Sequence, residues 1–352
     1  MSFPLFDGTI SLILSLAFGV PAAFLAQHLG LMDVPGSAPH KQHARATPLA
    51  GGILMFIVLL ILAFIHRSAL TREILAVLIG AAVIFAFGLW DDLHGLAAGP
   101  KLVGQLIAAG ILISFGVQVR FMTVIFDADV LSPVLAQLLN VLITLFWLVG
   151  ITNSMNMIDS MDGIVAGLGV IASAFFMGAA SLAGQPTLAF WAACLLGLSI
   201  GLYFWNGLAV RFFLGDSGAQ TIGFLLACFG ILYNPLGRAP ESSWIVPIML
   251  LGVPIFDTSL VVLSRFRRGQ SVGTGRRDHT YHRFIRLGMQ PRYAVLSVHL
   301  MSLVISSGAF LTFYLKPATA LFVFVFAIVG GLAFLFWLER QPALDDESSK
   351  TG

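Results

Sequence analysis

Two asparagines and two aspartates follow one another at intervals of three residues in an otherwise apolar stretch: Asn153, Asn156, Asp159 and Asp162. This spacing keeps their side chains on roughly one side of a helix or of a tight helix entry. Asp159 or Ser160 could cap a helix that follows, but a cap requires one such residue rather than four. We therefore predict that these side chains bind a metal ion, a base or a sugar.

Two further segments carry carboxylates beside apolar runs. Asp91 and Asp92 are adjacent, and paired carboxylates suit Mg²⁺, a hard cation that takes oxygen ligands. Asp216 lies in a Gly-Asp-Ser-Gly segment, whose glycines permit unusual backbone angles and where a helix start offers N–H donors to a phosphate. A hydrated helix end explains the first segment equally well, and a simple turn explains the second.

A loop that is dense in arginine contains His279 and His282, with Arg283 directly after them. A guanidinium group matches phosphate oxygens through its fork of donors. The positive-inside rule and anionic lipid headgroups explain the arginines just before this segment, but neither requires histidine. We predict that all three residues act on a phosphorylated substrate.

A second basic segment, with Lys41 and Arg45, precedes the next apolar run. It either orients that run in the membrane or contacts a diphosphate, and we expect the second. The sequence has no G-x-x-x-x-G-K-[ST] motif and no kinase-type glycine-rich loop, so nothing indicates the use of ATP.

Apolar helices must position these residues. The chain is 58% hydrophobic and 10% charged, whereas soluble domains are about 25% charged, so we predict an all-α integral membrane protein. Residues 1–340 would form one polytopic domain, followed by a polar tail at 341–352. No Lys or Arg precedes Lys41, so the first span is expected to be retained rather than cleaved as a signal peptide. Eleven runs approach the bilayer-spanning length of about 20 residues, at roughly 8–28, 49–66, 72–90, 102–118, 134–152, 163–182, 187–205, 218–233, 243–263, 293–313 and 318–338.

The basic residues indicate the orientation. Fourteen of the nineteen Lys and Arg residues fall in one alternating set of connections, which is therefore predicted to be cytoplasmic, with the N-terminus outside and the C-terminus inside. All the polar clusters lie in this set, which makes Asp216 a candidate third metal-binding arm. A transporter of nucleotide-sugars or lipid-linked sugars would need polar residues inside the spans, and we expect none. The pattern favours phosphoryl-type transfer involving a lipid at the cytoplasmic face; a Mg²⁺-dependent lipid phosphatase is a further alternative.

Five segments, in order along the chain, carry a resemblance to a known family: Thr47-Pro48-x-x-Gly51-Gly52, Asp91-Asp92, Asn153-x-x-Asn156-x-x-Asp159-x-x-Asp162-Gly163, Phe213-Leu-Gly-Asp216-Ser-Gly and His279-x-x-His282-Arg283. The chain resembles the polyprenyl-phosphate N-acetylhexosamine-1-phosphate transferases of the glycosyltransferase family 4 type. The resemblance implies transfer of a sugar 1-phosphate from a UDP-amino sugar to undecaprenyl phosphate, with release of UMP, in a bacterial inner membrane. It also implies Mg²⁺ as cofactor, with Mn²⁺ as the alternative.

The resemblance assigns roles by position. Asp91 and Asp92 match an acidic pair that binds Mg²⁺ and deprotonates the lipid phosphate, and Asp216 matches a metal ligand. We expect Asp92, Asp216 and Asn156 to hold the metal. The expected catalytic residues are Asp91, Asp92, Asp159, His279 and His282. The expected substrate-binding residues are Lys41, Arg45, Lys101, Asn153, Asp162, Asn206, Phe213 and Arg283, with Phe213 stacking on uracil. Whether attack is direct or passes through a carboxylate such as Asp159 stays open.

Two positions depart from the family pattern. A third acid that often follows the acidic pair is absent, since Leu93 and His94 come next, and Tyr281 takes the middle place of the usual His-x-His-His-Arg motif. The arginine-rich loop favours the branch that uses UDP-N-acetylglucosamine for O-antigen, lipopolysaccharide or other cell-wall glycans. Another UDP-amino sugar, or phospho-N-acetylmuramoyl-pentapeptide, is the alternative. We expect the lipid bilayer to be a partner and nucleic acid not to be one. A homodimer is an open alternative to a monomer.

Overall fold

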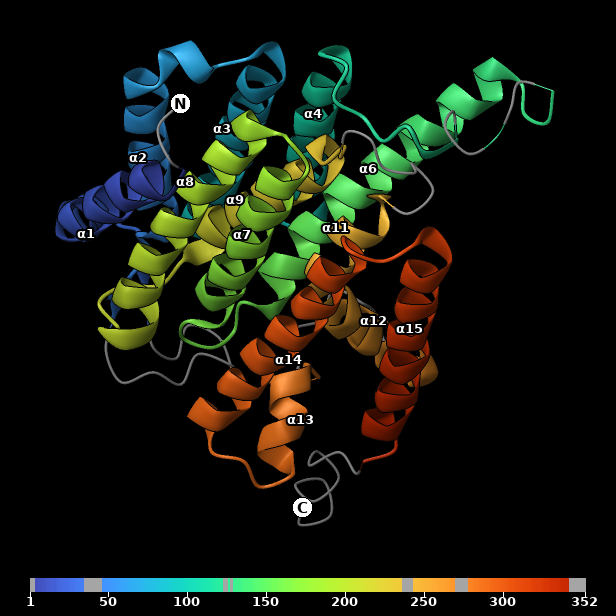
Figure 1. Ribbon diagram of the computed structural model, residues 1–352. Helices are drawn as coiled ribbons and strands as arrows, with labels where there is room; N and C mark the ends of the chain where they lie inside the picture. The colour runs from blue at the N-terminus through green and yellow to red at the C-terminus, as the bar shows by residue number, and fades with distance from the viewer. Residues whose placement is uncertain are drawn as a thin grey trace.

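The computed structural model describes residues 4–34, 46–122, 126, 129–235, 243–269 and 278–341, and it is dominated by helices (Figure 1). Within these residues, eight helical segments are long and apolar enough to cross a bilayer. This fits the predicted all-α integral membrane protein. The eight are α1 (Pro4–His28), α3 (Arg72–His94), α6 (Pro133–Ile158), α7 (Ile164–Leu182), α8 (Pro186–Leu202) with its π-helical continuation η2 (Tyr203–Leu208), α9 (Gly215–Leu232), α14 (Pro291–Thr312) and α15 (Pro317–Glu339).

Three of the eleven predicted segments take a different form. Helices α2 (Gly51–Ile65) and α4 (Ala98–Ser114) are apolar but have only 15 and 17 residues, which at 1.5 Å per residue gives about 22–26 Å. The segment predicted at 243–263 is divided into α11 (Ile245–Leu250) and α12 (Gly252–Arg267). The two meet at Leu251, whose backbone leaves the helical region, and Pro254 lacks the N–H group that would continue α11.

The remaining elements are short and lie between the long helices. They are the 3₁₀ turn η1 (Arg67–Ala69), the seven-residue helix α13 (Thr280–Arg286), and strands β1 (Met32–Asp33) and β2 (Thr47–Pro48), which pair antiparallel. Figure 1 shows α13 below α12, on the side of the molecule where α14 begins and α15 ends.

Helices α3 and α9 cross at a glycine. A Cβ atom on Gly88 would come within 2.5 Å of the Ser217 Cα atom and 2.8 Å of its backbone nitrogen. Only glycine therefore allows this approach, and small residues are the usual means by which membrane helices pack closely. The contact brings the last turn of α3, which carries the acidic pair, against the first turn of α9.

The segment after β2 holds the chain just before α9. Phe213 accepts hydrogen bonds at its carbonyl oxygen from the N–H groups of Ala50 and Gly51, and its own N–H donates to the carbonyl of Pro48 at 2.9 Å. Gly52 donates in the same way to Leu214. The Thr-Pro-x-x-Gly-Gly motif thus acts through its backbone, as a support for the Gly-Asp-Ser-Gly segment.

Polar side chains do lie inside the helices, contrary to the expectation from sequence. Gln105 on α4, Gln220 on α9 and Asp257 on α12 are all buried. Gln105 donates a hydrogen bond to Gln220 at 3.3 Å, so two of these residues are partners of each other. The mean hydropathy of a whole segment does not reveal these positions, because one polar residue changes that mean only slightly.

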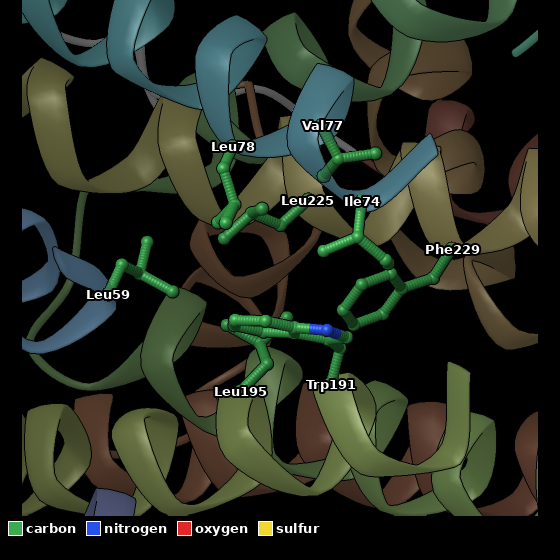
Figure 2. Close-up of a pocket in the computed structure, with 8 residues that line it drawn as sticks. All are labelled: Leu59, Ile74, Val77, Leu78, Trp191, Leu195, Leu225 and Phe229. Atoms are coloured by element: carbon green, nitrogen blue, oxygen red, sulfur yellow. The ribbon is translucent and has the colours of Figure 1, made fainter. Parts of the chain in front are cut away.

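An apolar cavity of about 10 Å³ lies where α2, α3, α8 and α9 meet. Figure 2 shows aliphatic side chains and the rings of Trp191 and Phe229 around it. This volume is about that of one water molecule, so no substrate fits. Ile74 and Val77 also line the cavity, and they precede Asp91 by several turns of α3, so the cavity is separate from the polar clusters.

Candidate active site

The carboxylate of Asp92 is bound to the N-terminus of α9. It accepts hydrogen bonds from the backbone N–H groups of Asp216 at 2.7 Å and Ser217 at 3.1 Å, and from the Ser217 hydroxyl at 2.6 Å. First-turn N–H groups have no partner inside their own helix, and the helix dipole favours an anion there. Gly215 permits this arrangement because its φ is +70° and a Cβ atom would lie 2.7 Å from an Asp92 oxygen.

Lys101 joins the acidic pair to the Gly-Asp-Ser-Gly segment. Its ammonium group contacts Asp91 and donates a 2.6 Å hydrogen bond to Asp216. The other Asp91 oxygen accepts from the N–H of Leu96 at 2.6 Å, and Asn156 donates to the second oxygen of Asp216 at 2.8 Å. Side chains from α3, α4, α6 and α9 therefore meet at one point.

The asparagine and aspartate stretch spans the end of α6 and the turn before α7. Asn153 and Asn156 lie in the last turns of α6, whereas Asp159 and Asp162 lie in the turn. Helix α7 begins at a left-handed Gly163 with no side-chain cap, so capping does not explain the four polar residues. Burial raises the pKa of Asp159 well above its usual range, and the charges of Asp216, Asp92 and Asp162 raise it further.

Asn153 has a different environment from Asn156. It exchanges two hydrogen bonds with Gln105, at 3.1 and 2.7 Å, and also donates to the carbonyl of Val149. These bonds tie α6 to α4 rather than presenting the amide to a ligand. In the structure Asn153 therefore supports the packing of α6 on α4, and a contact with substrate stays a prediction.

The histidine segment is attached to the same turn. The Tyr281 hydroxyl lies 2.5 Å from the Ser160 hydroxyl and 2.6 Å from Nε2 of His282. His279, at the start of α13, is held by the carboxylate of Asp257 at 2.7 Å. Because Ser160 follows Asp159, these contacts bring both predicted histidines beside the acidic cluster.

Arg283 points away from this cluster. The residue is 5% exposed. Its guanidinium donates to the carbonyl of Leu338, the carboxylate of Glu339, the hydroxyl of Ser264 and the carbonyl of Asp278. The residue therefore fastens α13 to the end of α15. Four of its five N–H donors are used within the protein, and a contact with substrate stays a prediction.

A second buried ion pair stabilises the same region. Asp278 accepts from Arg268 at 2.8 Å and from Arg265 at 3.5 Å. Burial by itself would raise the pKa of Asp278, but the hydrogen bond and charge of Arg268, with the charge of Arg265, outweigh it and lower this pKa below its usual value.

Asn206 and Phe213 are structural neighbours of the site. Asn206, in η2, accepts from the N–H of Gly163 at 2.8 Å and donates to the carbonyl of Phe212, and it is 3% exposed. Its amide therefore shapes the turn before α7, and its contact with substrate stays a prediction. Phe213 is half-buried, with its backbone bound to the segment after β2. Lys41 and Arg45 lie outside the described residues.

Sequence reasoning overlooked Asp257 and Gln105. Each is a single polar residue within an apolar segment, and this placement is the feature that could have drawn attention to them. It does not indicate their hydrogen-bond partners, because His279 lies 22 residues from Asp257 and Asn153 lies 48 residues from Gln105. The sequence likewise does not indicate that Ser217 donates to Asp92, because this contact depends on how helices α3 and α9 pack together.

The donor set suits Mg²⁺ in its chemistry. Asp91, Asp92, Asp216 and Asn156 offer oxygen atoms, which this ion prefers, and the ammonium group of Lys101 between Asp91 and Asp216 shows that a cation is accommodated there. Among the residues with described positions, no three His, Cys, Asp or Glu side chains stand ready to hold an ion. Metal binding would therefore require these carboxylates to turn from their present partners.

Comparison with known proteins agrees with the motifs. Residues 74–234 match the sequence profile of glycosyl transferase family 4. The decaprenyl-phosphate N-acetylglucosaminephosphotransferase of Mycobacterium tuberculosis is 32% identical to this chain, in an alignment that covers 95% of this chain and 88% of that protein. A probable undecaprenyl-phosphate N-acetylglucosaminyl 1-phosphate transferase of Bacillus subtilis is 29% identical over 328 residues, 93% of this chain and 88% of that protein. With this similarity along nearly its whole length, the chain belongs to glycosyl transferase family 4.

Proposed function

We propose that the chain transfers N-acetylglucosamine 1-phosphate from UDP-N-acetylglucosamine to undecaprenyl phosphate and releases UMP. The observation that carries the proposal is the contact of Lys101 with both Asp91 and Asp216, which gathers side chains of four helices at one end of the bundle. The relatives, whose names combine a polyprenyl phosphate with transfer of N-acetylglucosamine phosphate, support the same substrates.

The proposed reaction is an exchange of phosphoanhydrides. An oxygen of the lipid phosphate attacks the β-phosphorus of the UDP-sugar and forms a new P–O bond. The bond between that phosphorus and the bridging oxygen breaks, and the electron pair leaves with UMP. One phosphoanhydride replaces another, so the exchange is nearly balanced and needs no ATP.

The residues contribute mainly position and charge, as is general for phosphoryl transfer. Asp91 and Asp92 orient the lipid phosphate and accept its proton. Asn156 and Asp159 face the diphosphate, and Asp162 binds the nucleotide. His279 and His282 contact the diphosphate and sugar. When bound by Asp92, Asp216 and Asn156, Mg²⁺ would offset negative charge on the diphosphate.

We place this reaction at the cytoplasmic face of a bacterial inner membrane. The support is the excess of Lys and Arg on one side of the predicted spans, because UDP-sugars are cytoplasmic substrates. The nucleotide-sugar can then approach from water while the lipid phosphate approaches from the bilayer.

The test is release of UMP from UDP-N-acetylglucosamine by purified protein with Mg²⁺ and undecaprenyl phosphate. We expect stoichiometric formation of the lipid-linked sugar and loss of turnover when EDTA is added. Undiminished turnover with EDTA, or in both Asp92→Asn and Asp216→Asn, would contradict the metal assignment. Release of inorganic phosphate would indicate a lipid phosphatase instead. A parallel screen of other UDP-amino sugars tests the identity of the sugar.

A further inference from the structure

Asp257 is a carboxylate inside the protein that the proposed reaction does not use. It lies on α12, and its exposed fraction is 0%. A buried carboxylate must be compensated by hydrogen bonds or charge. Oδ2 lies 2.7 Å from Nδ1 of His279, and Oδ1 accepts from the N–H of Thr280 at 2.7 Å. Both partners stand at the start of α13, so this acid is directed at the histidine segment.

The contact determines the protonation pattern of His279. A carboxylate only accepts hydrogen bonds, so Nδ1 must carry a proton. In the neutral ring Nε2 then has a free lone pair, and in the imidazolium form Nε2 donates. In either state Nε2 is the atom left for a ligand.

The ring is close to the acidic cluster. The rings of His279 and Tyr281 lie 6.2 Å apart between centroids and are nearly parallel, at 11°. The Tyr281 hydroxyl in turn contacts Ser160, the residue after Asp159. His279 is thus separated from the turn that carries Asp159 by a single aromatic ring.

We propose that Asp257 is a positioning residue for the transfer reaction, which holds His279 with Nδ1 protonated and Nε2 directed at the phosphorylated substrate. The inference rests on the proposed function, because it assumes that His279 meets a diphosphate. A purely structural role is the rival explanation, since the bond to Thr280 also anchors the start of α13. The two roles predict different results.

The first experiment compares Asp257→Asn with wild type in the UMP-release assay, using full-length protein, UDP-N-acetylglucosamine and undecaprenyl phosphate. The carboxamide can still accept from Thr280, but its NH₂ group faces Nδ1 and selects the other tautomer. In serine hydrolases the same exchange lowers kcat about 10⁴-fold for this reason. We expect a fall in kcat of about 10²–10⁴-fold, with KM for the UDP-sugar within about 3-fold. Wild-type kcat would overturn the proposal.

Asp7→Asn is the matched control. Asp7 is also a buried aspartate, 1% exposed, and a histidine nitrogen, Nε2 of His66, lies 3.6 Å from it. His66 follows the C-terminal end of α2, whereas Gly51, at the N-terminal end of that helix, adjoins the site. We expect this variant to keep kcat within about 3-fold, because loss of a buried carboxylate by itself does not alter the His279 ring.

A double-mutant cycle separates positioning from structure. If Asp257 acts through His279, Asp257→Asn should reduce activity by less than about 3-fold when it is added to His279→Ala. If Asp257→Asn lowers activity by the same factor in the His279→Ala protein as in wild type, Asp257 acts independently of the imidazole, and the proposal is overturned.

A spectroscopic measurement covers the case in which Asp257→Asn does not fold. Wild-type protein labelled with ¹⁵N-histidine, with His279→Gln to assign the signal, reports which ring nitrogen carries the proton. We expect the Nδ1–H tautomer when the ring is neutral, and the Nε2–H tautomer would overturn the proposal. Because this measurement needs no turnover, a wild-type protein that releases no UMP would refute the proposed function separately.

Discussion

The carboxylate of Asp92 accepts hydrogen bonds from both the backbone N–H and the hydroxyl of Ser217, which lies 125 residues later in the chain. These bonds join the last turn of α3 to the first turn of α9. They therefore determine the relative positions of the two predicted metal ligands, Asp92 and Asp216, before any ligand binds.

Asp92→Asn should reduce UMP release about 10²-fold or more, because an amide cannot accept all three hydrogen bonds and its NH₂ group would face the N–H donors of α9. Steady-state kinetics of the purified variant provide the measurement. Asp129→Asn, at an exposed position outside the site, is the control and should retain wild-type rates. Equal rates in both variants would contradict this role of Asp92.

Ser217→Ala should remove one of the same hydrogen bonds while keeping the backbone contacts. We expect a loss of about 1.5–3 kcal/mol in the free energy of unfolding, since the bond involves a charged acceptor. Thermal denaturation in detergent measures it. A melting temperature equal to that of wild type would show that the hydroxyl contributes nothing to the α3–α9 contact.

The pH profile should show that Asp159 titrates abnormally. Burial and the charges of Asp216, Asp92 and Asp162 raise its pKa, so a reaction that needs its carboxylate loses rate as the pH falls through a value well above the usual aspartate pKa of about 3.9. Asp162→Asn removes one of those charges, which lowers the pKa of Asp159 and should shift the acidic limb of kcat/KM to lower pH. A limb that stays in place or moves upward would refute this interpretation.

Tyr281→Phe should loosen the link between the histidine segment and the turn before α7. The change removes the hydrogen bonds to Ser160 and His282, which should lower the free energy of unfolding by about 1–3 kcal/mol. We also expect kcat to fall about 10-fold because His282 loses its orientation. Tyr314→Phe is the control, since Tyr314 is an exposed residue on the bundle surface. If Tyr281→Phe keeps the stability and kcat of Tyr314→Phe, the Tyr281 hydroxyl does not link the histidine segment to the turn before α7.

Asp278→Asn should destabilise the protein in a pH-dependent way. Arg268 and Arg265 hold the pKa of Asp278 below its unfolded value despite burial, so the stabilisation is present above about pH 4 and is lost as the pH falls through the lower, folded-state pKa. Breaking this buried pair should cost about 3 kcal/mol at neutral pH. Melting temperatures of variant and wild type should therefore converge in acid; a constant difference would contradict the ion-pair explanation.

Sequence reasoning succeeded where residue type and local spacing carry the information. The regular asparagine and aspartate stretch, the acidic pair and the Gly-Asp-Ser-Gly segment were all predicted to converge, and Asn156, Asp91 and Asp216 do meet around Lys101. The roles that the resemblance assigns to Arg283 and Asn206 stay predictions. In the structure, the donors and acceptors of both side chains are used within the protein.

The sequence by itself determined that the protein is helical, membrane-embedded and a member of its family, because hydropathy and motif spacing depend on residues close together in the chain. Only the tertiary structure decided which polar groups pair. Asp92 with Ser217, Asp257 with His279 and Gln105 with Asn153 are contacts between separate segments. Such partners are chosen by how helices cross, and a buried polar group accepts whichever donor that crossing brings within about 3 Å.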